Sequence, residues 1–150
     1  MYEILIVGGG PAGLTAAMYA ARAGKHVAVL ERGSTGGQII SAPLVENYPG
    51  IPSVSGTELA RQMTEQACTF GAEIVYTEAV GLEKTPAGFR VLCTDGVREA
   101  KTVILATGAA HRRLDLPWET TLTGCGVSYC AVCDGAFYEG LDVAVVGGGD

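Results

Sequence analysis

The fold of this chain is most restricted by six residues near the N-terminus, Gly8-Gly9-Gly10-Pro11-Ala12-Gly13. They follow residues 4–7, an aliphatic run typical of a parallel strand that is buried on both faces. Gly8 allows a tight turn, Gly10 lets a pyrophosphate approach the backbone, and Gly13 lets a helix pack closely on the strand. The segment therefore predicts a strand, a dinucleotide-binding turn and a helix over 11–23.

A carboxylate completes this unit. Gly24 ends the predicted helix, residues 27–30 form the next aliphatic strand, and Glu31 closes that strand. An acidic residue at this distance from Gly13 is typical of one that accepts hydrogen bonds from ribose hydroxyls. The alternative is a solvated carboxylate at the end of a strand.

Two segments with different sequence patterns follow, one irregular and one helical. Residues 32–55 have no periodicity and many Gly, Pro and Ser residues, and loops of this length are usually functional. Ser55 and Glu58 form a capping box at the start of a predicted helix. Its apolar stripe predicts a core that contains Phe70 and a buried, inert Cys68.

Residues 74–106 have the pattern of strands. Turn signals at 85–88 and 95–96 predict a small antiparallel meander, in which Cys93 serves packing. Residues 103–106 then have the pattern of a buried strand. Thr107-Gly108 follows at the carboxyl end of that strand, where open α/β sheets bind ligands.

The strongest chemical signal is the run Cys130-Ala131-Val132-Cys133-Asp134. Two thiols at this spacing can close a small disulfide across one turn, because residues three apart lie on one face of a helix. A helix beginning there would favour the thiolate, which is the form that attacks disulfides. Asp134 is well placed to donate protons.

Zinc binding is the alternative for these thiols. A structural zinc site needs four ligands, usually two close cysteine pairs or one pair with nearby histidines. Cys68, Cys93 and Cys125 form no second close pair, and His26 and His111 lie in unrelated contexts. The pattern favours a redox dithiol with no metal, and inert thiols are the third possibility.

The C-terminal residues repeat the opening pattern. Residues 143–146 read as a new aliphatic strand, and Gly147-Gly148-Gly149-Asp150 begins a second fingerprint of the same kind. We therefore expect a second nucleotide fold that continues beyond residue 150.

Composition limits the function classes. The net charge of −6, with no basic run longer than Arg112-Arg113, argues against a nucleic-acid partner. The apolar run near the N-terminus is too short for a signal peptide or a membrane span. Five cysteines with one close pair fit a reducing cytoplasm.

Taken together, the motifs resemble one family, the low-molecular-weight thioredoxin reductases of bacteria and archaea. The matching residues are Gly8 to Gly13, Glu31, Gly36-Gly37-Gln38, Glu46-Asn47-Tyr48-Pro49-Gly50, Ala106-Thr107-Gly108-Ala109, Gly126-Val127-Ser128 and Cys130 to Gly135. One departure is Cys125, where the family usually has a basic residue. A second is Tyr129, just before Cys130, where the family usually has a small residue; we expect it to affect how the partner disulfide approaches.

The resemblance implies an α/β fold with two nucleotide-binding domains. Residues 1–113 would be the first part of a doubly wound, Rossmann-like FAD-binding domain with a small β-meander, and its closing segment would lie outside this chain. Residues 114–150 would begin the NADPH domain, whose binding site lies mostly beyond residue 150. The implied FAD contacts are Gly8, Gly10, Pro11, Ala12, Gly13, Glu31, Arg32, Gly37, Gln38, Asn47, Ala106, Thr107 and Gly108.

The implied activity is thioredoxin-disulfide reduction by a homodimer. Electrons would pass from NADPH through FAD to a Cys130–Cys133 disulfide and then to thioredoxin, with Cys133 facing the flavin, Cys130 facing the partner and Asp134 as proton donor. We expect these 150 residues to be inactive alone. The flavoprotein of an alkyl hydroperoxide reductase and a non-catalytic FAD- or metal-binding module are the alternatives. The former usually has proline and histidine between its cysteines and an N-terminal thioredoxin-like extension, and both are missing here.

Overall fold

The fold was obtained as a computed structural model, which describes residues 1–147, the side chain of Val132 excepted. The chain divides into two compact units, Met1–Gly108 and Ala109–Asp150, called unit 1 and unit 2 below. Within the described residues, no helix is both long and apolar enough to span a membrane.

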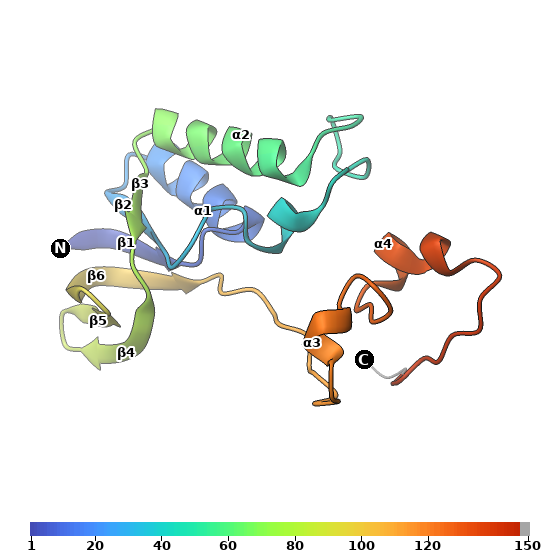
Figure 1. The fold of residues 1–150 in the computed structure, drawn as a ribbon. Coiled ribbons are helices and arrows are strands. Elements are labelled where there is room, and N and C mark those ends of the chain that lie inside the picture. Colours follow the sequence, from blue (N-terminus) through green and yellow to red (C-terminus); the bar gives the residue numbers. More distant parts are fainter. Residues whose placement is uncertain (148–150) are drawn as a thin grey trace. The chain divides into compact units, whose positions relative to one another are not determined.

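Unit 1 is built on one six-stranded sheet (Figure 1). Its strands are β1 (Tyr2–Val7), β2 (Val27–Glu31), β3 (Glu73–Tyr76), β4 (Ala79–Thr85), β5 (Gly88–Cys93) and β6 (Gly96–Leu105), in the spatial order β3-β2-β1-β6-β5-β4. Strands β3, β2, β1 and β6 are parallel, whereas β4, β5 and β6 form an antiparallel meander. The predicted α/β class, the parallel strands and the meander are therefore confirmed.

The two faces of the parallel strands have separate cores, because side chains alternate along a strand. Helices α1 (Pro11–Arg22) and α2 (Gly56–Thr69) lie side by side against one face, where Ile6, Val27 and Val29 are buried (Figure 1). The opposite face buries Leu5 and Ala28 together with residues of β5 and β6. Strand β1 is thus covered on both sides, as its aliphatic sequence predicts.

Both helices begin where their sequences predict, but the capping box is only half formed, because the carboxylate of Glu58 accepts hydrogen bonds from Arg61 and Gln62. Pro11 occupies the first turn of α1, where its missing N–H has no helical partner to lose. The Oγ of Ser55 caps α2 by accepting a hydrogen bond from the N–H of Glu58 at 3.2 Å. A 3₁₀ helix, η1 (Gly37–Ser41), interrupts the long irregular segment between β2 and α2.

The predicted stripe of α2 is wrong at its C-terminal end. Cys68 is exposed, and Phe70 is 43% exposed with the guanidinium of Arg22 over its ring, 5.2 Å from the centroid. Ala67 makes the last buried contact of the helix. A residue one position further is rotated by about 100° around a helix with 3.6 residues per turn, so Cys68 turns away from the core.

The burial predicted for Cys93 in the meander is confirmed, whereas the burial predicted for the end of β6 is not. Cys93 is buried, and this burial raises the pKa of its thiol, as expected for a packing residue. The strand expected at 103–106 forms the end of β6, but Leu105 is 65% exposed. The expectation that this end of the strand is fully buried is therefore wrong.

Unit 2 contains only short elements within its described residues. These are α3 (Glu119–Leu122), α4 (Ala131–Asp134) and a 3₁₀ helix, η2 (Gly135–Tyr138). The strand expected at 143–146 does not form, because a single strand needs a neighbour to satisfy its backbone hydrogen bonds. Most of the second glycine-rich fingerprint, residues 148–150, lies outside the described residues.

Candidate functional site

The glycine-rich turn of unit 1 lies where β1, β2 and β6 end. The N–H of Gly8 donates to the carbonyl of Leu30 at 2.9 Å, and the N–H of Ala106 donates to that of Val7 at 2.8 Å. Gly8 has a φ of +105°, and a Cβ there would lie 2.3 Å from the carbonyl oxygen of Ala106. Gly8 and Ala106, both predicted site residues, are thus brought into contact at the carboxyl edge of the sheet.

Gly10 and Gly13 differ in what surrounds them. A Cβ on Gly13 would lie 1.9 Å from the carbonyl oxygen of Gly8, so a side chain there would push α1 off the turn. A Cβ on Gly10 would meet no protein atom within 4 Å. The protein itself therefore requires glycine at position 13, whereas at position 10 it leaves open space.

The N-terminus of α1 faces this space with its backbone donors available. No side chain caps the helix at Gly10, and its first turn carries no acidic residue. The unpaired N–H groups at the start of a helix and its dipole favour a negatively charged group. The arrangement around Gly10, Pro11 and Ala12 is thus suited to a phosphate.

Glu31 is tied to the glycine turn. Its Oε2 accepts a hydrogen bond from the N–H of Gly9 at 2.7 Å, and its Oε1 accepts one from the N–H of Gly33 at 2.8 Å. A carboxylate has about four lone-pair sites, so these two contacts leave acceptor capacity for hydroxyl donors. Gly9 was absent from the predicted contact residues, although it lies inside the motif.

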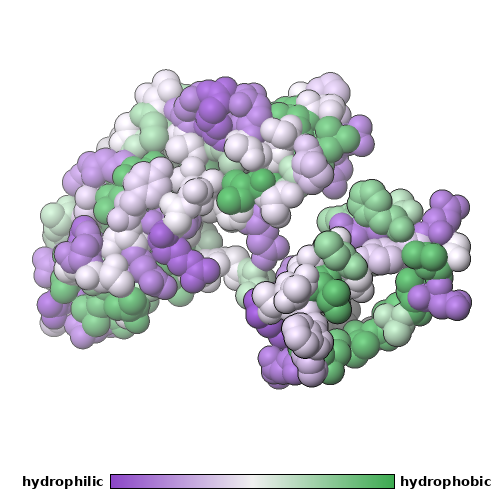
Figure 2. Space-filling model, in the orientation of Figure 1, coloured by the Kyte–Doolittle hydropathy of each residue, from purple (hydrophilic) through white to green (hydrophobic). Residues whose placement is uncertain are grey.

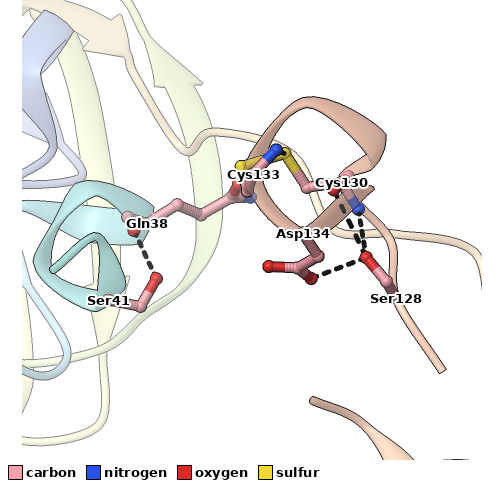
Figure 3. Close-up of a disulfide and its surroundings, with 6 residues drawn as sticks. All are labelled: Gln38, Ser41, Ser128, Cys130, Cys133 and Asp134. Carbon is pink, nitrogen blue, oxygen red and sulfur yellow. Dashed lines mark hydrogen bonds between the residues drawn. A yellow bond between two sulfur atoms is a disulfide. The ribbon is translucent and has the colours of Figure 1, made fainter. Parts of the chain in front are cut away.

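Gly36 and Gly37, in the irregular segment between β2 and α2, also lie against the glycine-rich turn. The N–H of Gly36 donates to the carbonyl of Gly9 at 2.7 Å, and a Cβ on Gly37 would lie 3.4 Å from the Cα of Gly10. Gln38 follows in η1, where its carbonyl accepts from the Oγ of Ser41 at 2.8 Å (Figure 3). The structure thus brings Gly37 next to Gly10, although the two are distant in sequence.

The remaining predicted contact residues of unit 1 have different surroundings. Thr107 lies beside Gly8, since a Cβ on Gly8 would be 3.3 Å from its Cα. Arg32 is 78% exposed, with its Nη1 3.8 Å from the Oε1 of Glu78. Asn47 is exposed on the loop, and Gly108 follows Thr107 with a φ of +71°. Their roles stay predictions.

In unit 2, Cys130 and Cys133 form a disulfide with their Cα atoms 5.3 Å apart. Cys130 caps α4, and its Sγ accepts a hydrogen bond from the N–H of Cys133 at 3.1 Å. Cys133 is exposed and Cys130 is half-buried. With each sulfur bonded to the other, the pair is in a form that two electrons and two protons can open.

Ser128 joins the disulfide to Asp134 (Figure 3). Its Oγ donates to the Oδ2 of Asp134 at 2.6 Å and accepts from the N–H of Cys130 at 3.1 Å. Asp134, at the end of α4, is therefore held close to the backbone that carries Cys130. Ser128 was recognised only as part of a motif, because the sequence does not reveal its hydrogen bonds.

Tyr129 was expected only to affect the approach of the partner disulfide, and Glu119 was not among the predicted site residues. The phenol of Tyr129 donates a hydrogen bond to the Oε1 of Glu119, and Glu119 is only 5% exposed. The acid at the start of α3 is visible in the sequence, but its burial and its contact with Tyr129 are not.

The other thiols are separate from this pair. Cys125 and Cys68 are exposed and Cys93 is buried, and none of the three is bonded to another cysteine. Among the described side chains, no three of His, Cys, Asp or Glu lie close enough to hold a metal ion.

Comparison with known proteins gives one consistent result. The family described as Pyridine nucleotide-disulphide oxidoreductase matches residues 2–150. Thioredoxin reductase of Treponema pallidum is 46% identical in an alignment of 150 positions that covers 99% of this chain and 49% of the relative. That of Bacillus subtilis is 45% identical, covering all of this chain and 48% of the relative. The crystal structure of thioredoxin reductase from Streptococcus pyogenes is 50% identical, with a TM-score of 0.80 over 92% of this chain and 45% of that one. The chain thus spans about half the length of these relatives.

Proposed function

Because this chain belongs to the pyridine nucleotide-disulphide oxidoreductase family, we propose that it supplies the FAD-binding region and the redox dithiol of a thioredoxin reductase. The observation that carries the proposal is the Cys130–Cys133 disulfide, with Asp134 held beside it by Ser128. The relatives named above support thioredoxin as the substrate.

The proposed domains follow the two units closely. Residues 1–113 form the first part of the FAD-binding domain, and residues 114–150 begin the NADPH domain. The division of the chain after Gly108 supports a boundary in this region. We further propose that the whole protein is cytoplasmic and that it is a homodimer. Sedimentation analysis of the purified protein would test the dimer.

The residues of unit 1 fit FAD. The open space at Gly10 and the uncapped start of α1 suit its pyrophosphate, and Glu31 retains acceptor capacity for ribose hydroxyls. Gly37, which lies against Gly10, lets the backbone approach the cofactor where a side chain would clash. When bound, FAD supplies two electrons that originate from NADPH.

The dithiol then transfers these electrons by thiol–disulfide exchange. The Cys130–Cys133 bond takes up two electrons and two protons and becomes two thiols. The Cys130 thiolate attacks one sulfur of the thioredoxin disulfide, forming a mixed disulfide and releasing the other sulfur as a thiolate. Cys133 attacks the sulfur of Cys130, which restores the Cys130–Cys133 bond and leaves thioredoxin reduced. Asp134 is the group proposed to pass protons to the departing thiolates.

Replacing Asp134 by asparagine is expected to slow thioredoxin reduction by roughly a hundred- to ten-thousandfold without stopping it, since water partly replaces a lost proton donor. The rate of thioredoxin reduction by the reduced whole protein, followed by stopped flow, measures the effect. Asp142→Asn, at an exposed aspartate of unit 2, is the control and should leave this rate unchanged. A wild-type rate in Asp134→Asn would remove Asp134 from the mechanism.

The electron donor is proposed to be NADPH. Steady-state thioredoxin reduction by the whole protein should show a kcat/KM with NADPH that exceeds the value with NADH by at least about tenfold. A preference for NADH would overturn the assignment of the donor and leave the dithiol chemistry standing.

A direct test of the proposed function combines visible absorption with this assay. Purified whole protein should show flavin absorption that NADPH bleaches and thioredoxin restores. Restoration by a peroxidase disulfide and not by thioredoxin would favour an alkyl hydroperoxide reductase flavoprotein. Flavin absorption that neither substrate restores would indicate a non-catalytic binding module.

A further inference from the structure

Unit 2 is organised around a buried carboxylate. Many of its apolar side chains are exposed, and hydrophobic surface is visible over this unit in Figure 2. The exposed residues include Trp118, Phe137 and Val145. Among the residues of unit 2 whose side chains are described, only Glu119 is buried. Hydrogen bonds to this side chain therefore link separate stretches of unit 2.

Glu119 joins two stretches of chain. Its Oε1 accepts from the N–H of Leu114 at 3.0 Å, and its Oε2 accepts from the N–H of Leu116 at 3.1 Å. Its Oε1 also accepts the phenolic hydrogen of Tyr129. The segment that precedes α3 is thereby tied to the segment that carries the dithiol.

Tyr129 is held by its ring as well as by its hydroxyl. The ring stacks on that of His111, with the centroids 5.0 Å apart and the planes inclined by 8°. The hydrogen bond lowers the pKa of Glu119 and raises that of Tyr129, because it joins a carboxylate to a neutral phenol. Such charge-assisted bonds are stronger than bonds between neutral groups.

The position of Tyr129 in the chain makes this contact relevant to the dithiol. Tyr129 lies between Ser128, which is bonded to Asp134, and Cys130, which forms the disulfide. The backbone leading into Cys130 is thus restrained on one side by Ser128 and on the other by the side chain of Tyr129. Freeing Tyr129 would leave Cys130 more conformations in which its sulfur is out of reach of Cys133.

We propose that Tyr129, held by Glu119, is a positioning residue that keeps Cys130 within reach of Cys133 and so favours the disulfide over the dithiol. This inference rests on the proposed function, in which the pair cycles between the two forms. Two thiols close a disulfide more readily when their effective concentration is high, and restraint of the backbone raises that concentration.

The test is the equilibrium of the whole protein with glutathione. Oxidised glutathione takes two electrons and two protons from the Cys130–Cys133 dithiol, which gives the protein disulfide and two molecules of reduced glutathione. Tyr129→Phe keeps the ring and removes the hydroxyl, so the equilibrium constant for disulfide formation should fall roughly threefold to tenfold, as expected for one lost hydrogen bond. Mass spectrometry of alkylated samples gives the fraction oxidised.

Glu119→Gln and Tyr138→Phe complete the set. Glu119→Gln removes the charged acceptor and should also lower the equilibrium constant for disulfide formation. This second variant keeps the proposal testable if Tyr129→Phe fails to fold. Tyr138→Phe removes a hydroxyl from another half-buried tyrosine of unit 2 and should leave the constant unchanged. A wild-type constant in Tyr129→Phe, even with a lower melting temperature, would show that the contact is only structural and overturn the proposal.

The assay separates this inference from the function on which it rests. If wild-type protein fails to reduce thioredoxin while Tyr129→Phe still shifts the glutathione equilibrium, the positioning role stands and the proposed substrate fails. If wild-type protein reduces thioredoxin and the equilibrium constant of Tyr129→Phe is unchanged, the positioning role fails and the proposed function stands.

Discussion

Serine at either Cys130 or Cys133 is expected to reduce NADPH-dependent thioredoxin reduction by the whole protein to the uncatalysed rate. One sulfur attacks the partner disulfide and the other resolves the mixed disulfide, so neither can complete the exchange alone. Both variants should retain FAD, because the residues proposed to hold it belong to unit 1 whereas the cysteines belong to unit 2. NADPH should still bleach the flavin absorption, since flavin reduction precedes the thiol step.

The matched control is Cys125→Ser. Cys125 is an exposed free thiol in the same unit, and its replacement should leave the rate of thioredoxin reduction unchanged. Serine at Cys130 with the full rate, or loss of activity in Cys125→Ser alone, would contradict the assignment of the dithiol. Trapping a mixed disulfide between Cys133→Ser and thioredoxin would identify Cys130 as the attacking residue.

Valine at Gly10 is expected to weaken FAD binding on the order of a hundredfold or more, because its side chain would occupy the space proposed for the pyrophosphate. The fold should survive, since a Cβ at this position meets no protein atom within 4 Å and the φ of −74° suits any residue. Fluorescence titration of the flavin-free whole protein with FAD measures the affinity. Wild-type affinity in Gly10→Val would refute this placement of the pyrophosphate.

Gly13→Ala separates binding from folding. Its methyl group would lie 1.9 Å from the carbonyl oxygen of Gly8, so α1 must move away from the turn. We expect the free energy of unfolding to fall by about 3 kcal/mol, near the upper end of overpacking effects. Thermal denaturation should therefore distinguish Gly13→Ala from Gly10→Val, whose melting temperature without FAD should stay close to that of the wild type.

Local sterics and side-chain periodicity explain why much of unit 1 was predictable. A glycine whose Cβ would overlap a backbone atom, as at Gly8 and Gly13, is recognisable from the motif. The cap at Ser55 and the turns of the meander also depend on residues close in sequence. These features identified the α/β class, the parallel strands and the region of the proposed cofactor site.

Only the tertiary structure decided which distant groups meet. The contact of Gly37 with Gly10 and the burial of Glu119 against Tyr129 depend on how loops fold back, which no local pattern encodes. Cys68 is exposed because it follows the buried Ala67 by one position and so lies on another side of α2. Residues 143–146 form no strand because a strand needs a neighbouring strand for its hydrogen bonds. Hydrogen-bond partners and burial are properties of the packed chain, whereas backbone sterics and capping belong to a few neighbouring residues.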